Sequence, residues 1–348
     1  MRADKIPSRI DFPPVSILKP LKGTDSSLKE NLKSFFDLDY PRFEILISVA
    51  DETDPALPIV YELLEENPLS PVRLFIGETD VGINPKVNNM MKSYESVQHD
   101  WIWISDSNVR VERNELTQML SQIDENTGVL TGLVSGRNPQ SLGGYLEASY
   151  LNTFYAKWMT LAAQFKKPCV IGKSMLFKKS MAQRFGGIAI LSRYLAEDFM
   201  AGEATRKLGL KVQSNRRPIQ QILDEHYTVK DFWYRHIRWG RMRKSQAPFA
   251  FYGEALTSSL TCGTVLAYAS DMSITLLLFH FATWWVGDFW VQMKMGSRLT
   301  LMSFLTWTLR EIFALPLWAH IAIGNTVVWR GQRLRLLDGG LLDDSKVA

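Results

Sequence analysis

Two patterns of hydrophobic and polar residues divide the chain near residue 250. Up to that point, short β-branched apolar runs alternate with longer stretches whose apolar residues have helical spacing. This alternation predicts an α/β domain built on a parallel sheet, with ligands gathered at the carboxyl ends of the strands. The predicted strands are residues 15–18, 43–49, 72–76, 101–105, 129–134, 170–177 and 211–214. The predicted helices are residues 26–36, 55–65, 86–96, 113–124, 142–165 and 194–208.

Beyond this domain, expected at residues 1–250, the chain carries apolar stretches at 256–269, 272–292 and 299–328. The last two are long enough to cross a bilayer, which takes roughly 20 residues. The first is short and rich in Ser and Thr. We therefore expect two full spans and one re-entrant or third span within residues 251–330, followed by a basic-to-acidic tail at 331–348.

Ionisable residues interrupt the apolar stretches at Asp288 and at the pair Arg310-Glu311. Charges within a membrane span are costly and usually face protein or a water-filled cavity. These residues are therefore candidates for a functional polar cluster, with a structural contact between helices as the alternative.

Composition narrows the class and the location of the protein. The 348 residues, 46% of them hydrophobic, suffice for one sizeable globular domain plus membrane segments. The net charge of +4 is small, and its basic residues cluster at 235–244 and 330–335, which suits an anionic membrane surface better than nucleic acid. The two cysteines, Cys169 and Cys262, are too few for a disulfide framework or a zinc cluster.

The cysteine usage predicts a reducing environment, so we expect the catalytic domain to face the cytosol. Together with the apolar stretches, this predicts an integral membrane protein. Residues 1–14 are polar and contain proline, which predicts neither a signal peptide nor an N-terminal membrane helix. Attachment to the membrane is expected through the C-terminal stretches.

Three polar positions are candidates for binding a nucleotide. Lys19 follows the first predicted strand, where nucleotide phosphates approach the edge of such a sheet. Asp51 follows the second strand and is placed to accept from a uracil or a ribose, whereas Asp54 is more typical of a helix cap. Lys86 opens a predicted helix, where backbone N–H groups favour anions; a solvated lysine on a capped helix is the alternative.

Asp106 heads an Asp-Ser-Asn triplet directly after the buried strand 101–105. Its oxygen suits a hard divalent ion, and Mn²⁺ or Mg²⁺ bridging a diphosphate takes only one or two protein carboxylates. A turn closed by the aspartate side chain is the competing interpretation.

Two further segments supply a base and cations. Asp198 lies at the start of a predicted helix and is a candidate general base for a hydroxyl, with helix capping as the alternative. Arg235, Arg238 and Trp239 place two fixed cations and an aromatic plane ahead of the apolar region. They are suited to a departing diphosphate, although Arg and Trp beside a membrane segment are also common interfacial anchors.

Several segments together resemble the ceramide glucosyltransferase family, over a region from about Val15 to the tail at Trp329–Gly340. The segments are Lys19–Gly23, Phe36–Pro41, Arg73–Gly77, Val81–Lys86, Trp103–Ser107, Ala196–Asp198 and Arg235–Trp239. The family comprises inverting glycosyltransferases of the GT-A fold, with three aspartates followed by an Arg/Gln-x-x-Arg-Trp motif.

The resemblance implies a role for each matched position. It implies that Asp51 contacts the nucleotide, that Asp106 holds the metal and diphosphate, and that Asp198 is the base. Arg235, Arg238 and Trp239 are expected to hold the diphosphate and frame the acceptor site. The resemblance also implies UDP-glucose as donor, a divalent cation, and ceramide as the lipid acceptor in the cytosolic leaflet.

Three alternatives stay open at this point. One keeps the chemistry but transfers N-acetylglucosamine from its UDP form to a hopanoid polyol, as relatives of this family do. A processive polysaccharide synthase shares the Arg-x-x-Arg-Trp type of motif but usually has more membrane helices. A scaffold that binds a nucleotide sugar without turnover is the third, although every candidate catalytic position is filled.

Overall fold

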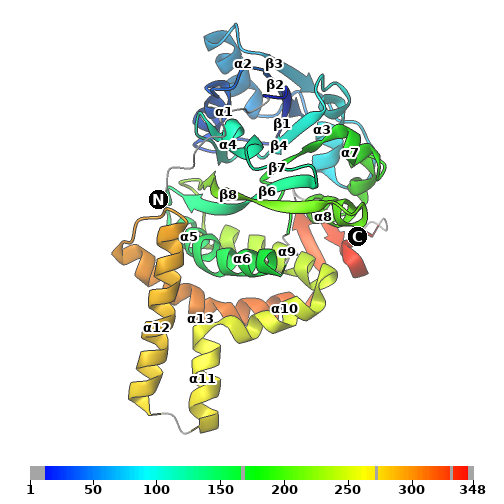
Figure 1. Cartoon of the computed structure of the whole chain (residues 1–348). Helices are drawn as coiled ribbons and strands as arrows, with labels where there is room; N and C mark the ends of the chain where they lie inside the picture. Colours follow the sequence, from blue (N-terminus) through cyan, green and yellow to red (C-terminus); the bar gives the residue numbers. More distant parts are fainter. Residues whose placement is uncertain (1–11, 166–168, 271–272, 330–331, 344–348) are drawn as a thin grey trace. The chain divides into compact units, whose positions relative to one another are not determined.

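The computed structural model describes residues 12–165, 169–270, 273–329 and 332–343 (Figure 1). These residues fall into two compact units. The first unit lies within Met1–Val134 and Met159–Ile222, and the second within Ser135–Trp158 and Leu223–Ala348. The composition boundary near residue 250 therefore does not coincide with the division by contacts, which groups the Arg235–Trp239 segment with the apolar helices.

The first unit is built on a sheet of eight strands in the order β3-β2-β1-β4-β7-β6-β8-β5. Its strands are β1 (Val15–Leu21), β2 (Phe43–Val49), β3 (Val72–Ile76), β4 (Trp101–Ser105), β5 (Val109–Arg110), β6 (Thr127–Arg137), β7 (Ser174–Lys178) and β8 (Lys211–Ile222). The first four pair in parallel, β7 runs antiparallel to β4 and β6, and β5 runs antiparallel to β8.

The prediction of a parallel sheet is thus right for half of the strands and wrong for the rest. Hydrophobic periodicity records which residues are buried but not the direction of a strand. Two further differences concern length. The strand predicted at 170–177 begins only at Ser174, after a turn, and the strand predicted at 211–214 continues to Ile222.

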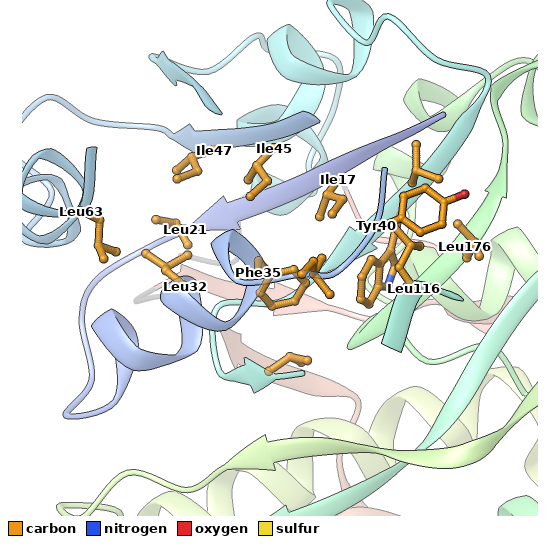
Figure 2. Close-up of a cluster of buried hydrophobic side chains, with 14 of the residues drawn as sticks. Ile17, Leu21, Leu32, Phe35, Tyr40, Ile45, Ile47, Leu63, Leu116 and Leu176 are labelled. Atoms are coloured by element: carbon orange, nitrogen blue, oxygen red, sulfur yellow. The ribbon is translucent and has the colours of Figure 1, made fainter. Parts of the chain in front are cut away.

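Helices cover both faces of this sheet. They are α1 (Leu28–Phe36), α2 (Ala56–Glu66), α3 (Pro85–Glu95), α4 (Glu115–Leu120), α7 (Lys179–Gln183) and α8 (Glu197–Lys207), with a 3-10 helix η2 (Ile188–Arg193). Neighbouring residues of β4 point to opposite faces, so that Trp103 joins one core cluster and Ile102 and Ile104 join the other. Figure 2 shows the first cluster, in which Phe35 of α1 packs beneath the strands.

The second unit is mainly helical. It contains α5 (Leu142–Ser149), the π-helical segment η1 (Tyr150–Tyr155), the start of α6 (Ala156–Gln164), α9 (Val229–Gln246), α10 (Pro248–Glu254), η3 (Ala255–Thr257), α11 (Ser259–Ser270), α12 (Ile274–Lys294) and α13 (Leu301–Ile323). An antiparallel hairpin of β9 (Thr326–Trp329) and β10 (Gln332–Arg335) and a short helix η4 (Asp338–Gly340) follow. The helix predicted at 142–165 is therefore interrupted by the π-helical segment.

The helix α9 begins with a capping box, in which Thr228 and Asp231 exchange side-chain and backbone hydrogen bonds. It packs so closely on α13 that a Cβ atom at Gly240 would lie only 2.4 Å from the side chain of Ile321. Near its end, Lys244 donates to the carbonyl oxygens of Ala322 and Gly324 at 2.8 and 2.6 Å. This part of the basic cluster therefore caps α13.

Among the described residues, α12 is the one helix that is long and apolar enough to cross a membrane. It lies beside α11 (Figure 1). The stretch predicted to span at 299–328 is not one helix, since α13 ends at Ile323 and the following residues turn into β9. The count of two full spans and one partial span stays a prediction.

Candidate active site

The first unit brings four segments together at the carboxyl end of β4. Asp106 follows β4, Lys86 lies in the first turn of α3, and Glu197 and Asp198 open α8. The fourth segment is the turn before β7, in which the backbone N–H of Ser174 donates to the carbonyl of Ile171. Residues far apart in the sequence thus share one small volume.

Lys86 is the centre of this cluster. Its Nζ lies 2.9 Å from both Asp106 Oδ1 and Glu197 Oε1. Asn84 caps α3 by accepting from the backbone N–H of Lys86 and donates to Glu197 Oε2 at 3.2 Å, which fixes both partners. Burial alone would lower the pKa of Lys86, but the charges of Asp106, Glu197 and Asp198 outweigh it and raise the pKa above its ordinary value.

Asp106 carries a second cation on its other oxygen. Lys173 Nζ lies 3.0 Å from Asp106 Oδ2 and donates to Asn108 Oδ1 at 2.7 Å. Burial opposes ionisation of Asp106, but the charges of Lys86 and Lys173 prevail and hold its pKa well below its usual range. The carboxylate is therefore ionised and lies between two cations.

Asp198 is held by two backbone groups. Its Oδ2 accepts from the N–H of Gly172 at 2.5 Å, and its Oδ1 accepts from the N–H of Phe199 at 2.7 Å. Burial and the charge of Glu197 raise the pKa of Asp198 to about 6, with Lys86 and the backbone donors limiting the rise. A carboxylate with this pKa is ionised at neutral pH yet basic enough to take a proton.

Lys19 lies beneath the cluster instead of at its surface. Its side chain is fully buried, its Nζ donates to the backbone carbonyl of Asp106 at 2.7 Å, and it stands 3.8 Å above the ring of Phe35. Burial lowers the pKa of Lys19 to about 7. The contact observed for Lys19 is thus with the Asp106 backbone, and direct contact with a nucleotide stays a prediction.

The two aspartates after β2 have different surroundings. Asp54 is buried and accepts from the N–H groups of Gly23 and Ala56 at 3.0 and 2.9 Å, so it ties the end of β1 to the start of α2. Asp51 is exposed and closes a turn by accepting from the N–H of Thr53 at 2.8 Å. An exposed carboxylate at the edge of the sheet is compatible with the predicted nucleotide contact.

Gly172 and Lys173 are site residues that sequence reasoning missed as individual candidates. A Cβ atom at Gly172 would lie 2.9 Å from Lys86 Nζ and 3.0 Å from Asp198 Oδ2, so only glycine leaves room for both groups. Nothing in the letters of this turn indicated that its backbone faces Asp198. That information comes only from the fold.

Gly172→Ala is expected to displace Asp198 and Lys86. The rate of the expected sugar transfer should then fall by about a hundredfold, because small displacements of catalytic groups slow a reaction strongly. Steady-state kinetics at saturating donor measure the effect. Gly253→Ala is the control, since a Cβ there meets nothing within 4 Å. Equal activities of the two variants would contradict the role given to the turn.

The Arg235–Trp239 segment belongs to the second unit, on α9. The guanidinium of Arg235 stacks over the ring of Trp239 at 4.5 Å and pairs with Glu147 Oε1 at 3.3 Å. His236 Nε2 lies 2.7 Å from Glu147 Oε2. Glu147, fully buried on α5, thus fixes this part of the segment, and sequence reasoning did not single it out. Arg238 is half-buried on the same helix.

The described residues hold no group of three or more His, Cys, Asp or Glu side chains that would suit a metal ion. Asp106 is nevertheless a hard oxygen donor whose side chain is 23% exposed. Such a carboxylate fits a divalent ion that substrate diphosphate oxygens also ligate, and does not fit an ion held by the protein alone. Asn108, the last residue of the Asp-Ser-Asn triplet, accepts from Lys173.

The chain is similar in sequence to known ceramide glucosyltransferases. Ceramide glucosyltransferase 1 of Caenorhabditis elegans is 29% identical over 346 residues, covering 96% of this chain and 74% of that protein. Ceramide glucosyltransferase of Komagataella phaffii is 27% identical, covering 92% of this chain and 82% of that protein.

Among solved structures, the mannosyltransferase PcManGT from Pyrobaculum calidifontis, in complex with GDP-Man and Mn²⁺, superimposes with a TM-score of 0.53. The match covers 89% of this chain and 86% of that chain at 14% identity, and it confirms the predicted GT-A fold. The model of Glycosyl transferase family 21 matches residues 1–342. The chain is a glycosyltransferase and belongs to glycosyl transferase family 21.

Proposed function

We propose that this enzyme transfers glucose from UDP-glucose to the primary hydroxyl of ceramide and forms glucosylceramide with inversion at the anomeric carbon. The observation that carries the proposal is the Asp198 carboxylate, held by the backbone N–H of Gly172 in the cluster where Lys86 and Lys173 pair with Asp106. The relatives reported above are named as ceramide glucosyltransferases, which favours ceramide over the hopanoid alternative.

The chemistry requires one displacement. Asp198 takes the proton of the acceptor hydroxyl as its oxygen attacks the anomeric carbon. The bond from that carbon to the diphosphate oxygen breaks, and UDP leaves with the bonding electrons. Lys86 and Lys173 supply positive charge to the departing diphosphate. A divalent ion bound by Asp106 and the diphosphate would neutralise further charge.

Arg235, Arg238 and Trp239 keep the role that the family motif predicts, holding the diphosphate and framing the acceptor. The stacking of Arg235 on Trp239 and its pairing with Glu147 support this role, because they pre-order a planar cation. With α12 as a candidate span and relatives named for a lipid acceptor, we further propose that the catalytic unit works at the cytosolic face of a membrane.

The proposal is tested by supplying the purified full chain with UDP-glucose or UDP-N-acetylglucosamine, each with ceramide or a hopanoid polyol. Labelled glucosylceramide is expected, and only the combination of UDP-glucose with ceramide should give a product. Transfer of N-acetylglucosamine to the hopanoid would replace the substrates, a polymeric product would indicate a polysaccharide synthase, and UDP binding without turnover would indicate a scaffold. Asp124→Asn, an exposed change outside the site, is the control for preparation quality.

Chelation of divalent ions is expected to weaken UDP binding by at least about tenfold, because the Asp106 carboxylate and the diphosphate are both anions and repel each other without a divalent cation between them. Calorimetry of UDP binding with Mn²⁺ and with EDTA measures this. Asp106→Asn should bind UDP weakly in both buffers. If that variant kept a full response to Mn²⁺, Asp106 would not be the metal ligand.

A further inference from the structure

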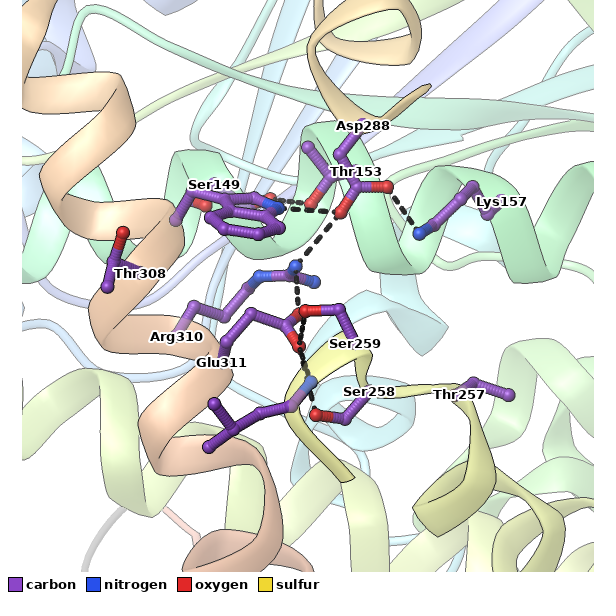
Figure 3. A network of polar contacts seen from close by, with 12 residues as sticks. Ser149, Thr153, Lys157, Thr257, Ser258, Ser259, Asp288, Thr308, Arg310 and Glu311 are labelled. Carbon is purple, nitrogen blue, oxygen red and sulfur yellow. Dashed lines mark hydrogen bonds and ion pairs between the residues drawn. The ribbon is translucent and has the colours of Figure 1, made fainter. Parts of the chain in front are cut away.

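A charge-balanced network joins α6, α11, α12 and α13 (Figure 3). Asp288 of α12 pairs with Lys157 and accepts from the Nη2 of Arg310, on α13, at 3.0 Å. Arg310 also pairs with Glu311, which accepts from the hydroxyl of Ser259, at the start of α11, at 2.8 Å. These contacts place a guanidinium and a carboxylate at fixed positions among apolar helices.

A cavity of about 60 Å³ lies beside this network and is lined only by residues of the second unit. His236, Arg243, Glu254, Arg310 and Glu311 form its polar side. Its apolar walls include Phe154, Phe232, Ala314, Leu315, Trp318 and Ile321. The volume suits a polar group of a few heavy atoms and excludes a whole lipid.

Two of the lining side chains carry a buried nitrogen without a hydrogen-bond partner. They are Nδ1 of His236, which is 1% exposed, and Nε of Arg310, which is 5% exposed. Buried polar atoms are almost always paired, because an unpaired one costs about 1–3 kcal/mol. Both side chains line the same cavity, so a single bound group is a candidate partner for both atoms.

The two nitrogens are complementary in character. The Glu147 carboxylate accepts from Nε2 of His236, which places the ring proton on Nε2. Burial lowers the pKa of His236 despite the charge of Glu147, so the ring is neutral and Nδ1 offers a lone pair. Arg310 Nε–H can only donate. One acceptor and one donor are what a secondary amide, with its N–H and C=O, requires.

We propose that this cavity binds the amide group of the lipid acceptor, with its N–H donating to His236 and its C=O accepting from Arg310. The inference rests on the proposed function, because ceramide carries one such amide between its two chains. The chains would leave along the apolar wall, where Leu315 both lines the cavity and is 48% exposed. His236 also belongs to the Arg235–Trp239 segment, which links the cavity to the family motif.

The experiment compares ceramide with an analogue in which –NH–CO– is replaced by –CH₂–CH₂–, using the full chain in lipid nanodiscs. The wild type should prefer ceramide by at least about tenfold in kcat/KM, the worth of hydrogen bonds to a charged partner. Ala314→Leu fills the cavity and should raise the KM for ceramide at least about tenfold and abolish that preference. Ala319→Leu, equally half-buried on α13 but outside the cavity lining, is the matched control.

A second variant, Arg310→Lys, keeps the charge beside Asp288 and Glu311 but lacks the Nε–H donor. It should lose most of the preference for the amide while the KM for UDP-glucose stays within about twofold of the wild type. Equal behaviour of Ala314→Leu and Ala319→Leu, or equal use of both acceptors by the wild type, would overturn the amide site alone. A wild type that glucosylates neither acceptor would overturn the proposed function itself.

Discussion

Asp198→Asn is expected to lower the rate of glucosyl transfer on the order of 10³-fold, within the range that a general base contributes. The amide oxygen of Asn can still accept from the N–H of Gly172, which keeps the turn in place, but it has no basicity at neutral pH. Single-turnover kinetics with saturating donor and ceramide measure the chemical step. UDP affinity should stay within about twofold, because Asp198 does not provide the charge that holds the diphosphate.

Glu203→Gln is the control for this change, since Glu203 lies on the same helix α8 and forms a local ion pair with Arg206. It should transfer glucose at the wild-type rate. If Asp198→Asn and Glu203→Gln were equally active, another group would have to remove the acceptor proton.

Lys86→Met is expected to have two large effects. Removing one partner from a buried ion pair leaves Asp106 and Glu197 with less compensation, which should lower the free energy of unfolding by about 3–5 kcal/mol. The charge of Lys86 also lowers the pKa of Asp198, so its loss should raise that pKa further above 6. Chemical denaturation and a pH–rate profile measure the two effects.

The sign of the pH effect follows from the role of Asp198. Its ionised form is the active one, so wild-type activity should fall as the pH drops through about 6. In Lys86→Met the activity should begin to fall at a higher pH than in the wild type. Lys86→Arg keeps the charge and should lose activity over the same pH range as the wild type. A profile shared by all three proteins would show that Lys86 does not tune the base.

The sequence predicted the site residues that combine a chemical type with a recognisable place in an element. Asp106 directly follows a buried strand, and Lys86 and Asp198 each lie in the first turn of a helix. Because the ends of parallel strands meet at one edge of a sheet, such positions converge in the fold. The structure brings these three residues together, and their roles in catalysis stay predictions.

Other residues were beyond a reading of the sequence for a physical reason. Gly172 acts through its backbone N–H and its missing Cβ, neither of which has a chemical signature in the sequence. Lys173 is one of many lysines until the turn places it beside Asp106. Glu147 looks like an ordinary helical glutamate, and only the packing of α5 against α9 shows that it holds Arg235 and His236.

Strand direction and the division into units were hidden for a related reason. Burial patterns are the same for parallel and antiparallel strands, so the sequence could not show that β7 runs antiparallel to β4. Composition likewise separated polar from apolar residues, but α9 is a polar helix that packs with apolar ones through Gly240. Contacts at single small residues decide such associations.

The most direct test of the central claim is the anomeric configuration of the lipid that the purified wild-type chain makes from UDP-glucose and ceramide. UDP-glucose carries its sugar in the α configuration, and one in-line displacement assisted by Asp198 inverts it. Proton NMR of the product should therefore show β-glucosylceramide. An α-linked product would contradict single displacement and, with it, the role of Asp198 as the base.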